Sequence, residues 1–248
     1  MNEIIKNLFC FYRETGTLTS ASFHHNPYCS MVAGTKNTWP QMVFDVELSE
    51  KPALKLAHAL NQVVDQKSPG FAVCNAGLFK TKDLEILLDK GIYPVKIWML
   101  MDAVPSAKIT WVQSKDFEIK ELNTSGELLA FGALVNSVLM QTLKMQPALM
   151  IEMHEKPAFH SYGLFSESEL ISGLLTYSGL QSTGLYFIVT RPDYRGKGLA
   201  EKLIQHVMHI LFLQKIKKVV LQAVQKAVPL YTRLGFASQG KLIIFWKP

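Results

Sequence analysis

Apolar side chains recur along the chain at two spacings, which predict an alternation of helices and strands. Between 198 and 214, apolar residues stand three and four positions apart, as on one face of an amphipathic helix. Short apolar runs before and after this segment are typical of buried strands. In the second half of the chain the sequence predicts helices over 126–143, 198–214 and 227–234. It predicts strands there over 117–122, 158–166, 170–177, 184–190, 217–223 and 241–246.

The first half of the chain repeats this alternation. Helical spacing opens the sequence, and a second apolar stripe at helical spacing follows Pro52, a residue suited to a first helical turn. Strands followed by crossover helices predict a mixed sheet, and therefore an α/β or α+β fold. The predicted helices are 4–12, 52–66 and 83–88, and the predicted strands are 29–33, 41–48, 70–74 and 95–101.

The polar segment 102–116, which contains Pro105, predicts a boundary between two domains, 1–112 and 113–248. Both parts show a strand, a long helix, a strand and a short helix that ends at Gly91 or Gly235. The spacing of these elements is nearly the same in both, which favours one design used twice. Each domain would then be a mixed, largely antiparallel sheet flanked by helices. A shared order of elements in two unrelated domains is the alternative.

Composition indicates a globular protein with a sizeable core, since 48% of the 248 residues are hydrophobic and 19% are charged. No apolar run approaches the roughly 18 residues that span a bilayer. The first residues lack the pattern of a secretion signal, so we expect a cytoplasmic protein without a membrane partner. Three widely spaced cysteines and an isolated pair of histidines predict neither a disulfide framework nor a metal site.

Positive charge is concentrated in the last quarter of the chain. From Leu185 onward there are eleven basic residues and only two acidic ones, Asp193 and Glu201. Such a segment suits a polyphosphate ligand or a nucleic acid, and a solvated lysine surface is the alternative. The segment carries no interleaved aromatics and no helix-turn-helix pattern, so we do not expect a nucleic-acid partner.

A glycine-rich loop lies between a predicted strand and a predicted helix at 185–200. Pro192 ends the strand because proline cannot donate to the ladder, and the helix begins near Gly198. Gly196 and Gly198 allow close approach of a ligand to the backbone, and the first N–H groups of the helix have no internal partner. With Arg195 and Lys197 beside it, this terminus predicts a phosphate site.

Two common glycine motifs do not fit this loop. A dinucleotide fingerprint requires a third glycine, and that position holds Glu201. A P-loop requires glycine, lysine and serine or threonine in succession, which the loop lacks. A structural turn without a ligand is the remaining alternative.

Two sequence motifs carry a resemblance to a known family. The segment Val189-x-x-Pro192-x-x-Arg195-Gly196-x-Gly198-Leu199-Ala200 resembles the signature of the GNAT family of N-acetyltransferases. Downstream, Ala227-x-x-Leu230-Tyr231-x-x-Leu234-Gly235-Phe236 resembles the later motif of the same family. The resemblance covers roughly 117–248. The first half matches only in the order of its elements, and the resemblance implies that it is a degenerate GNAT-like copy.

The resemblance implies a fold, a cofactor and an activity. It implies an acyltransferase that moves an acetyl group from acetyl-coenzyme A to an amine of a small molecule or protein, by direct attack in a ternary complex. Strand N–H groups would stabilise the oxyanion, and Tyr231 would protonate the departing thiolate; a buried aromatic covering the sheet is the alternative role for Tyr231. The implied cofactor-binding residues are Phe187, Ile188 and Val189 for the pantetheine, and Arg195, Gly196, Lys197, Gly198, Leu199 and Ala200 for the pyrophosphate.

The sequence departs from the family pattern in two places. Val224 stands where the family often has an asparagine that contacts the pantetheine, and 181–184 carry no carboxylate to act as general base. Water, Glu167 or Glu169 are the candidates for that base. These departures support a second hypothesis, a coenzyme A-binding sensor or scaffold without turnover.

The first half lacks the residues of a coenzyme A site. Acidic residues and no glycine follow its corresponding strand at 47–52, and the position that matches Tyr231 holds Leu87. We therefore expect this half to shape the acceptor pocket. Trp39 and Asn37 are candidates for acceptor binding, and a structural role for both is the alternative.

Overall fold

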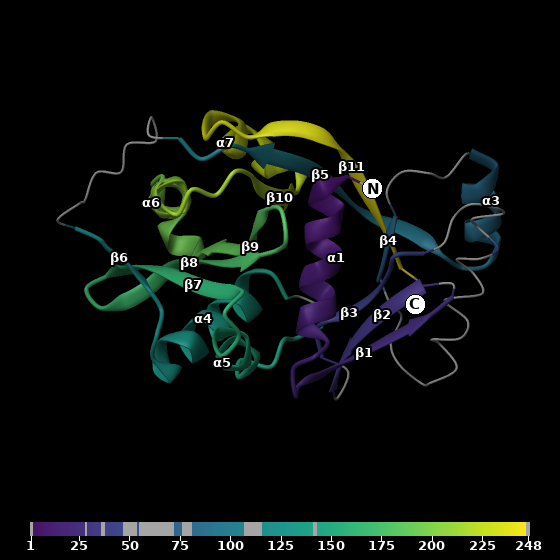
Figure 1. The fold of residues 1–248 in the computed structure, drawn as a ribbon, viewed down its shortest axis with the longest axis horizontal. Coiled ribbons are helices and arrows are strands. Elements are labelled where there is room, and N and C mark those ends of the chain that lie inside the picture. The colour runs from purple at the N-terminus through teal and green to yellow at the C-terminus, as the bar shows by residue number, and fades with distance from the viewer. Residues whose placement is uncertain are drawn as a thin grey trace.

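One long sheet runs through both halves of the chain in the computed structural model (Figure 1). The structure describes residues 2–27, 29–35, 38–46, 54, 72–75, 81–106, 116–140 and 143–246. Within these residues the sheet has 11 strands in the order β1-β2-β3-β4-β11-β5-β10-β9-β8-β7-β6. The strands are β1 Ala21–Asn26, β2 Cys29–Gly34, β3 Gln41–Phe44, β4 Ala72–Asn75, β5 Tyr93–Ala103, β6 Glu118–Glu121, β7 Phe159–Ser166, β8 Glu169–Ser178, β9 Thr183–Thr190, β10 Val219–Ala223 and β11 Ala237–Trp246.

Helices cover both faces of this sheet. Large apolar side chains of α1, α4 and α5 pack on one face, and those of α6 and α7 pack on the other. In Figure 1, α6 and α7 lie above β7–β9, and α4 and α5 lie below them. The helices are α1 Glu3–Thr15, α3 Thr81–Asp89, α4 Ser125–Val138, α5 Leu149–His154, α6 Leu199–Leu213 and α7 Val228–Arg233, with short 3-10 turns η2 Pro192–Tyr194 and η3 Gln225–Ala227.

The sheet is mixed and largely antiparallel, which confirms the predicted fold class. Among the described strands, β3 pairs with β4 and β9 pairs with β10 in parallel, and every other neighbouring pair is antiparallel. Each parallel pair is followed along the chain by a short helix, α3 or α7, and then by a long strand. The two halves therefore show the same succession of elements. The division at 112 and the origin by duplication stay predictions.

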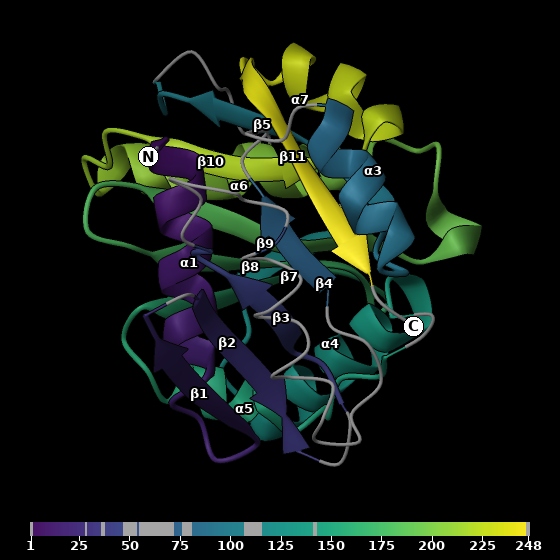
Figure 2. The ribbon, with the colours of Figure 1, turned by 90° about the vertical axis from the view of Figure 1, so that its right-hand side faces the viewer.

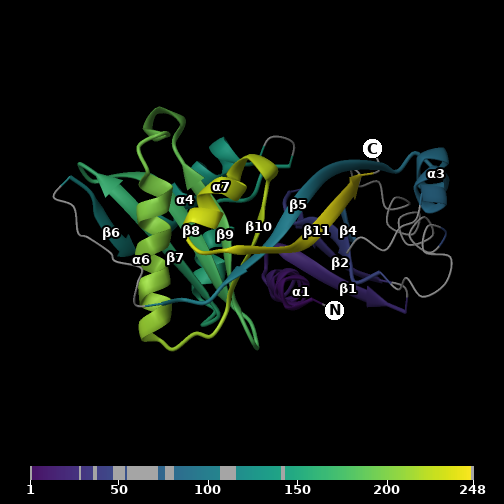
Figure 3. The same cartoon turned by 90° about the horizontal axis from the view of Figure 1, so that it is seen from above.

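The long strands β5 and β11 are exchanged between the halves. β5 follows β4 along the chain but pairs with β10, and β11 follows β10 but pairs with β4. The two strands also pair with each other, and Figure 3 shows them side by side from α7 to α3. Neither half completes its own sheet.

Helix α1 lies at the junction of the halves, where it contacts β2, β5, β9 and β10. Its start is fixed by Asn2, whose side chain accepts a hydrogen bond from the N–H of Ile4 at 2.8 Å. Leu8 and Phe11 share its inner face and are buried in the same core as α4 and α5. α3 packs on the opposite face of the N-terminal strands, as Figure 2 shows, around Leu87 and Val43.

Several predicted boundaries differ from the observed ones. α4 ends at Val138 instead of 143, because the side chain of Asn136 bonds both the N–H and the carbonyl of Met145 and so holds the returning chain. β1 and α5 were absent from the prediction, since β1 is half-exposed with two histidines and α5 is one short, uncapped segment. The predicted helix 52–66, apart from Leu54, lies outside the described residues.

Candidate functional site

Strand β9 loses its partner on one edge after its first two residues. Its parallel pairing with β10 consists of Thr183 with Val219 and Gly184 with Val220. Beyond Gly184, β9 continues to Thr190 with β8 as its neighbour on the other edge only, among the described strands. Backbone groups that a ladder would use are therefore left available along the second half of β9.

A bulge lies in this unpaired stretch. Leu174 of β8 stands opposite both Phe187 and Ile188, and Phe187 has a left-handed φ of 49°. Tyr186 and Phe187 consequently both pack on the α1 face of the sheet, while Ile188 packs on the α6 face. The three predicted pantetheine contacts lie in and beside this bulge, although the carbonyl of Val189 already accepts a hydrogen bond from Ser172 at 2.7 Å.

The glycine loop carries the chain from β9 into α6. Gly196 and Gly198 have φ values of 78° and 72°, and space around both is open where a side chain would begin. Gly198 caps α6 without a side chain, and Leu199 starts the helix. Within the described part of the chain, no acceptor is found for the N–H groups of 196–200. These donors and the helix dipole suit the loop to binding an anion, and we call it the anion cradle.

The positive charges around the loop have different partners. Arg191 pairs with Glu169 and, through Nη2 at 2.7 Å, with Asp193, whose pKa it lowers. Lys197 Nζ lies 4.9 Å from the ring centroid of Tyr194, and Arg195 Nε donates to the carbonyl of Thr190 at 3.3 Å. Neither Arg195 nor Lys197 forms an ion pair with a described carboxylate. Their charge is thus available to a ligand, while that of Arg191 is compensated.

The ion pair of Glu169 bears on its candidacy as general base. Arg191 engages this carboxylate, and the role of Glu169 as the base stays a prediction. Glu167 lies in the turn between β7 and β8, where it and Ser168 both have positive φ. Among the described residues, none forms an ion pair with the side chain of Glu167, and its role stays a prediction.

Tyr231 lies in α7, at the end of β10 where the ladder with β9 has opened. Its side chain is 7% exposed and packs in the α6 core, with its ring 6.0 Å from that of Phe236. Burial raises its pKa to about 12, so the hydroxyl keeps its proton at neutral pH. None of the described residues hydrogen-bonds to this hydroxyl. A protonated, unpartnered hydroxyl can donate to a group in the site.

The N-terminal half reaches the bulge through aromatic rings. The ring centroid of Trp39 lies 5.0 Å from that of Phe187, and Phe11 of α1 lies 6.1 Å from Phe187. The backbone N–H of Trp39 donates to the carbonyl of Lys144, in the segment between α4 and α5, at 3.0 Å. Of the two residues considered for acceptor binding, the structure thus places Trp39 beside the bulge, and Asn37 lies outside the described residues. Leu87 is buried in α3.

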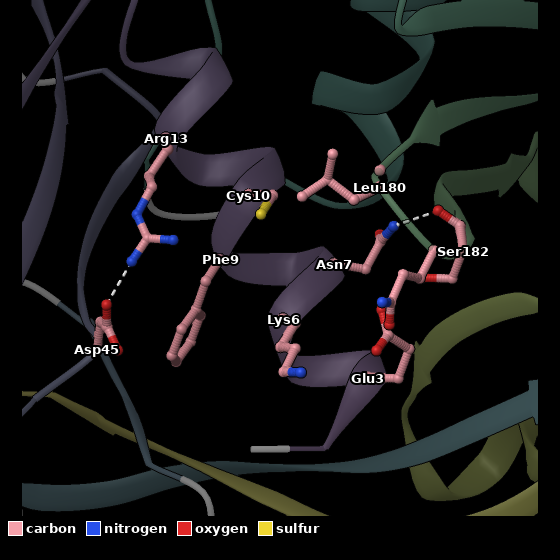
Figure 4. Close-up of a pocket in the computed structure, with 11 residues that line it drawn as sticks. Glu3, Lys6, Asn7, Phe9, Cys10, Arg13, Asp45, Leu180 and Ser182 are labelled. Carbon is pink, nitrogen blue, oxygen red and sulfur yellow. Dashed lines mark hydrogen bonds and ion pairs between the residues drawn. The ribbon is translucent and has the colours of Figure 1, made fainter.

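A separate pocket of about 400 Å³ lies on α1, and the sequence had given no sign of it (Figure 4). Asn7 forms its wall and is buried between two partners: its Nδ2 donates to the carbonyl of Ser182 at 2.8 Å, and its Oδ1 accepts from Tyr186 at 2.7 Å. The pocket therefore adjoins the residue before the bulge, but it contains neither the glycine loop nor Tyr231. Its lining residues are Glu3, Lys6, Asn7, Phe9, Cys10, Arg13, Asp45, Gly179, Leu180, Gln181 and Ser182.

The described residues show neither a metal site nor a membrane-spanning helix. They contain no group of three histidine, cysteine or acidic side chains placed to hold a metal ion. In the same part of the chain, no helix combines the length and the apolar character that crossing a membrane would require.

Both glycine-containing motifs lie in a part of the chain that is similar to a known family. Residues 137–236 match the sequence model of the acetyltransferase (GNAT) family. The SPbeta prophage-derived uncharacterized N-acetyltransferase YokL of Bacillus subtilis (strain 168) is 30% identical over 104 residues. That alignment covers 39% of this chain and 59% of YokL, so it spans less than two thirds of that relative.

Solved structures match over almost the whole chain. A GCN5-related N-acetyltransferase from Kribbella flavida superposes with a TM-score of 0.68 at 12% identity, covering 100% of this chain and 97% of that protein. One from Sphaerobacter thermophilus gives 0.67 at 14% identity, over 95% and 83% of the two chains. A tandem GNAT protein from the clavulanic acid biosynthesis pathway gives 0.64 at 10%, over 93% and 83%. At such identities the likeness shows the fold alone.

Proposed function

Because residues 137–236 match the sequence model of the GNAT family of acetyltransferases, we propose that this chain is an enzyme that moves an acetyl group from acetyl-coenzyme A to a primary amine. One observation carries the proposal. The unpaired, bulged half of β9 runs directly into a helix terminus whose N–H groups lack acceptors. The extended pantetheine arm of coenzyme A can bind along an unpaired strand edge, and the pyrophosphate at its end can bind at the helix terminus that follows. The enzyme would work in the cytoplasm, where thiols such as Cys10 and Cys29, both free in the structure, stay reduced.

The substrate would lie along β9 with its pyrophosphate at the start of α6. The N–H groups of Gly196, Lys197, Gly198, Leu199 and Ala200 would hold phosphate oxygens, and the side chains of Arg195 and Lys197 would add charge. Backbone groups of Phe187, Ile188 and Val189 would bind the pantetheine, with N–H groups of the bulge near the carbonyl oxygen. Backbone binding would make the missing asparagine at Val224 less important.

The reaction would proceed by direct attack in a ternary complex. The amine nitrogen bonds to the acetyl carbon, the carbonyl oxygen takes up negative charge, and N–H groups of β9 stabilise it. The carbon–sulfur bond then breaks, and the thiolate takes a proton from the hydroxyl of Tyr231. The amine loses its proton to water, since 181–184 carry no carboxylate.

A coenzyme A-binding sensor without turnover is the second candidate, favoured by Val224 and by the ion pair that engages Glu169. To separate the two, the full chain is incubated with acetyl-coenzyme A and a panel of amines, and thiol release is followed. Amine-dependent thiol release supports the enzyme. Thermal stabilisation by coenzyme A without thiol release from any amine supports the sensor.

A further inference from the structure

We infer that Trp39, contributed by the N-terminal half, determines which amines the enzyme accepts, and that it favours amines carrying an aromatic or bulky apolar group. The inference rests on the proposed function and names the substrate class of the same site. Its starting observation is that the rings of Trp39 and Phe187 meet edge to face, 5.0 Å apart with an interplanar angle of 76°. We call these two residues the aromatic pair.

The aromatic pair is not a fully buried core contact. Both rings remain partly exposed although they pack against the core that α1 and α4 share. Phe11, by contrast, is 1% exposed and stacks on Tyr186 at 4.1 Å. The pair thus presents apolar ring surface at the point where β9 bulges, while the rings behind it are closed to solvent.

The aromatic pair packs on the α1 face of the sheet, which in our inference is the face that the amine approaches. The glycine loop, α6 and Tyr231 belong to the opposite face, where the nucleotide end of coenzyme A would be held. A thioester threaded between β9 and β10 would therefore present its carbonyl toward Phe187. An amine that attacks it must come from the α1 face and pass the aromatic pair.

The backbone of Trp39 is held by the segment that precedes α5. Its N–H donates to the carbonyl of Lys144 at 3.0 Å, and Trp39 forms an isolated bridge with Met145. Asn136 holds the same segment through Met145. A ring held this way loses little freedom on binding, which favours recognition by surface contact.

The chemistry of this surface selects the substituent on the amine. The described side chains in ring contact with Trp39 are Phe11 and Phe187, so they offer no carboxylate for a second ammonium group. Aromatic contact and burial of apolar area both increase the affinity for an amine that carries a ring or a bulky aliphatic group next to its nitrogen. Polyamines and small polar amines gain nothing from the same surface.

The test compares binding of 2-phenylethylamine and ethylamine to the full chain saturated with coenzyme A, by calorimetry. We expect the wild type to bind 2-phenylethylamine about tenfold more tightly or better. Trp39→Ala should bring the two affinities within about a factor of three, and Trp39→Phe should keep most of the preference. Phe23→Ala is the matched control, since Phe23 packs partly exposed on the same core and its ring lies 6.3 Å from Phe44. It should leave the preference intact.

Each outcome separates the inference from the proposed function. A Trp39-dependent preference without thiol release supports the inference about binding and rejects turnover. Thiol release with no preference, or with a preference that Trp39→Ala leaves intact, overturns the inference and keeps the enzyme. If Trp39→Ala does not fold, Trp39→Leu replaces it, with the same expected loss. A shift of selectivity among acyl chains of the thioester, with the amine preference unchanged, would assign the aromatic pair to the acyl group and reject the inference.

Discussion

The hydroxyl of Tyr186 donates a hydrogen bond to Oδ1 of Asn7 at 2.7 Å, across 179 positions of sequence. Because Tyr186 precedes the bulge of β9, this bond ties the candidate site to the first helix. Asn7 is 3% exposed and has a second bond to the carbonyl of Ser182. Removing either partner leaves a polar group without compensation in the core.

We therefore expect Asn7→Ala and Tyr186→Phe to destabilise the fold unequally and non-additively. Asn7→Ala should cost about 2–4 kcal/mol, since the hydroxyl of Tyr186 loses this acceptor and the carbonyl of Ser182 keeps only the N–H of Gly179 as a donor. Tyr186→Phe should cost about 1–2 kcal/mol. A double-mutant cycle from urea denaturation should give a coupling of about 1 kcal/mol between them. A coupling of zero would show that the bond contributes nothing to stability.

Substitution of Gly198 tests the anion cradle. Gly198→Glu should weaken coenzyme A binding at least about a hundredfold, because it places negative charge where a phosphate would lie. Gly198→Ala adds only the strain of a left-handed residue, about 1–2 kcal/mol, in open space. Gly126→Glu, in the open first turn of α4, is the control and should leave affinity unchanged. If Gly198→Glu binds coenzyme A as tightly as the wild type does, the loop is not part of the coenzyme A site.

Tyr231→Phe isolates the proposed proton donor. Turnover should fall roughly ten- to a hundredfold with little change in coenzyme A affinity, since the ring and its contact with Phe236 remain. The melting temperature should hardly move, because no described residue bonds to the lost hydroxyl. Unchanged turnover would place the acid elsewhere.

The raised pKa of Tyr231 also predicts a pH profile. With a pKa of about 12, the hydroxyl stays protonated through the range in which most amines lose their proton. The rate should therefore rise with pH as the amine deprotonates and should show no fall due to Tyr231 below about pH 10. A rate that declines between pH 7 and 9, at unchanged stability, would contradict the assignment.

Glu152 of α5 makes the contact between the halves depend on pH. Its carboxylate accepts hydrogen bonds from the N–H and the hydroxyl of Ser20, the first at 3.0 Å. Burial acts to raise its pKa, but the bonds from Ser20 and Thr19 outweigh burial and lower it below 4.5. The stabilisation is thus fully present above pH 4.5 and is lost as the pH falls through the lowered pKa of the folded state.

Glu152→Gln should consequently remove part of the acid sensitivity. Between pH 6 and pH 3 the wild type should lose about 1–2 kcal/mol more of its free energy of unfolding than the variant does. Urea denaturation at each pH measures this difference. Parallel pH curves for the two proteins would show that Glu152 does not link the halves in this way.

Truncation tests the strand exchange. The fragment 113–248 lacks β5, and it leaves β10 with two pairs to β9 and β11 with no strand partner. It should unfold without a cooperative transition, and co-expression with 1–112 should restore one. A fragment that melts cooperatively near the temperature of the full chain would show that the C-terminal part is complete by itself.

The C-terminal site could be read from the sequence because its parts are local. Strand, proline, glycines and helix follow one another within 185–200, and the structure keeps that order. The bulge at Phe187 and the closeness of Trp39 could not be read, since they depend on the register of β8 and on a segment nearly 150 positions away. The partners of β5 and β11 were equally hidden, because apolar patterning shows that a strand is buried and not beside which strand it lies.

The exchange of β5 and β11 makes each half of the chain depend on the other for a complete sheet. Each long strand is encoded in one half of the gene and completes the sheet of the other. A deletion that removed the N-terminal half would also take away the neighbour of β10, next to Tyr231. A first half without catalytic residues of its own would therefore be retained by selection on the second.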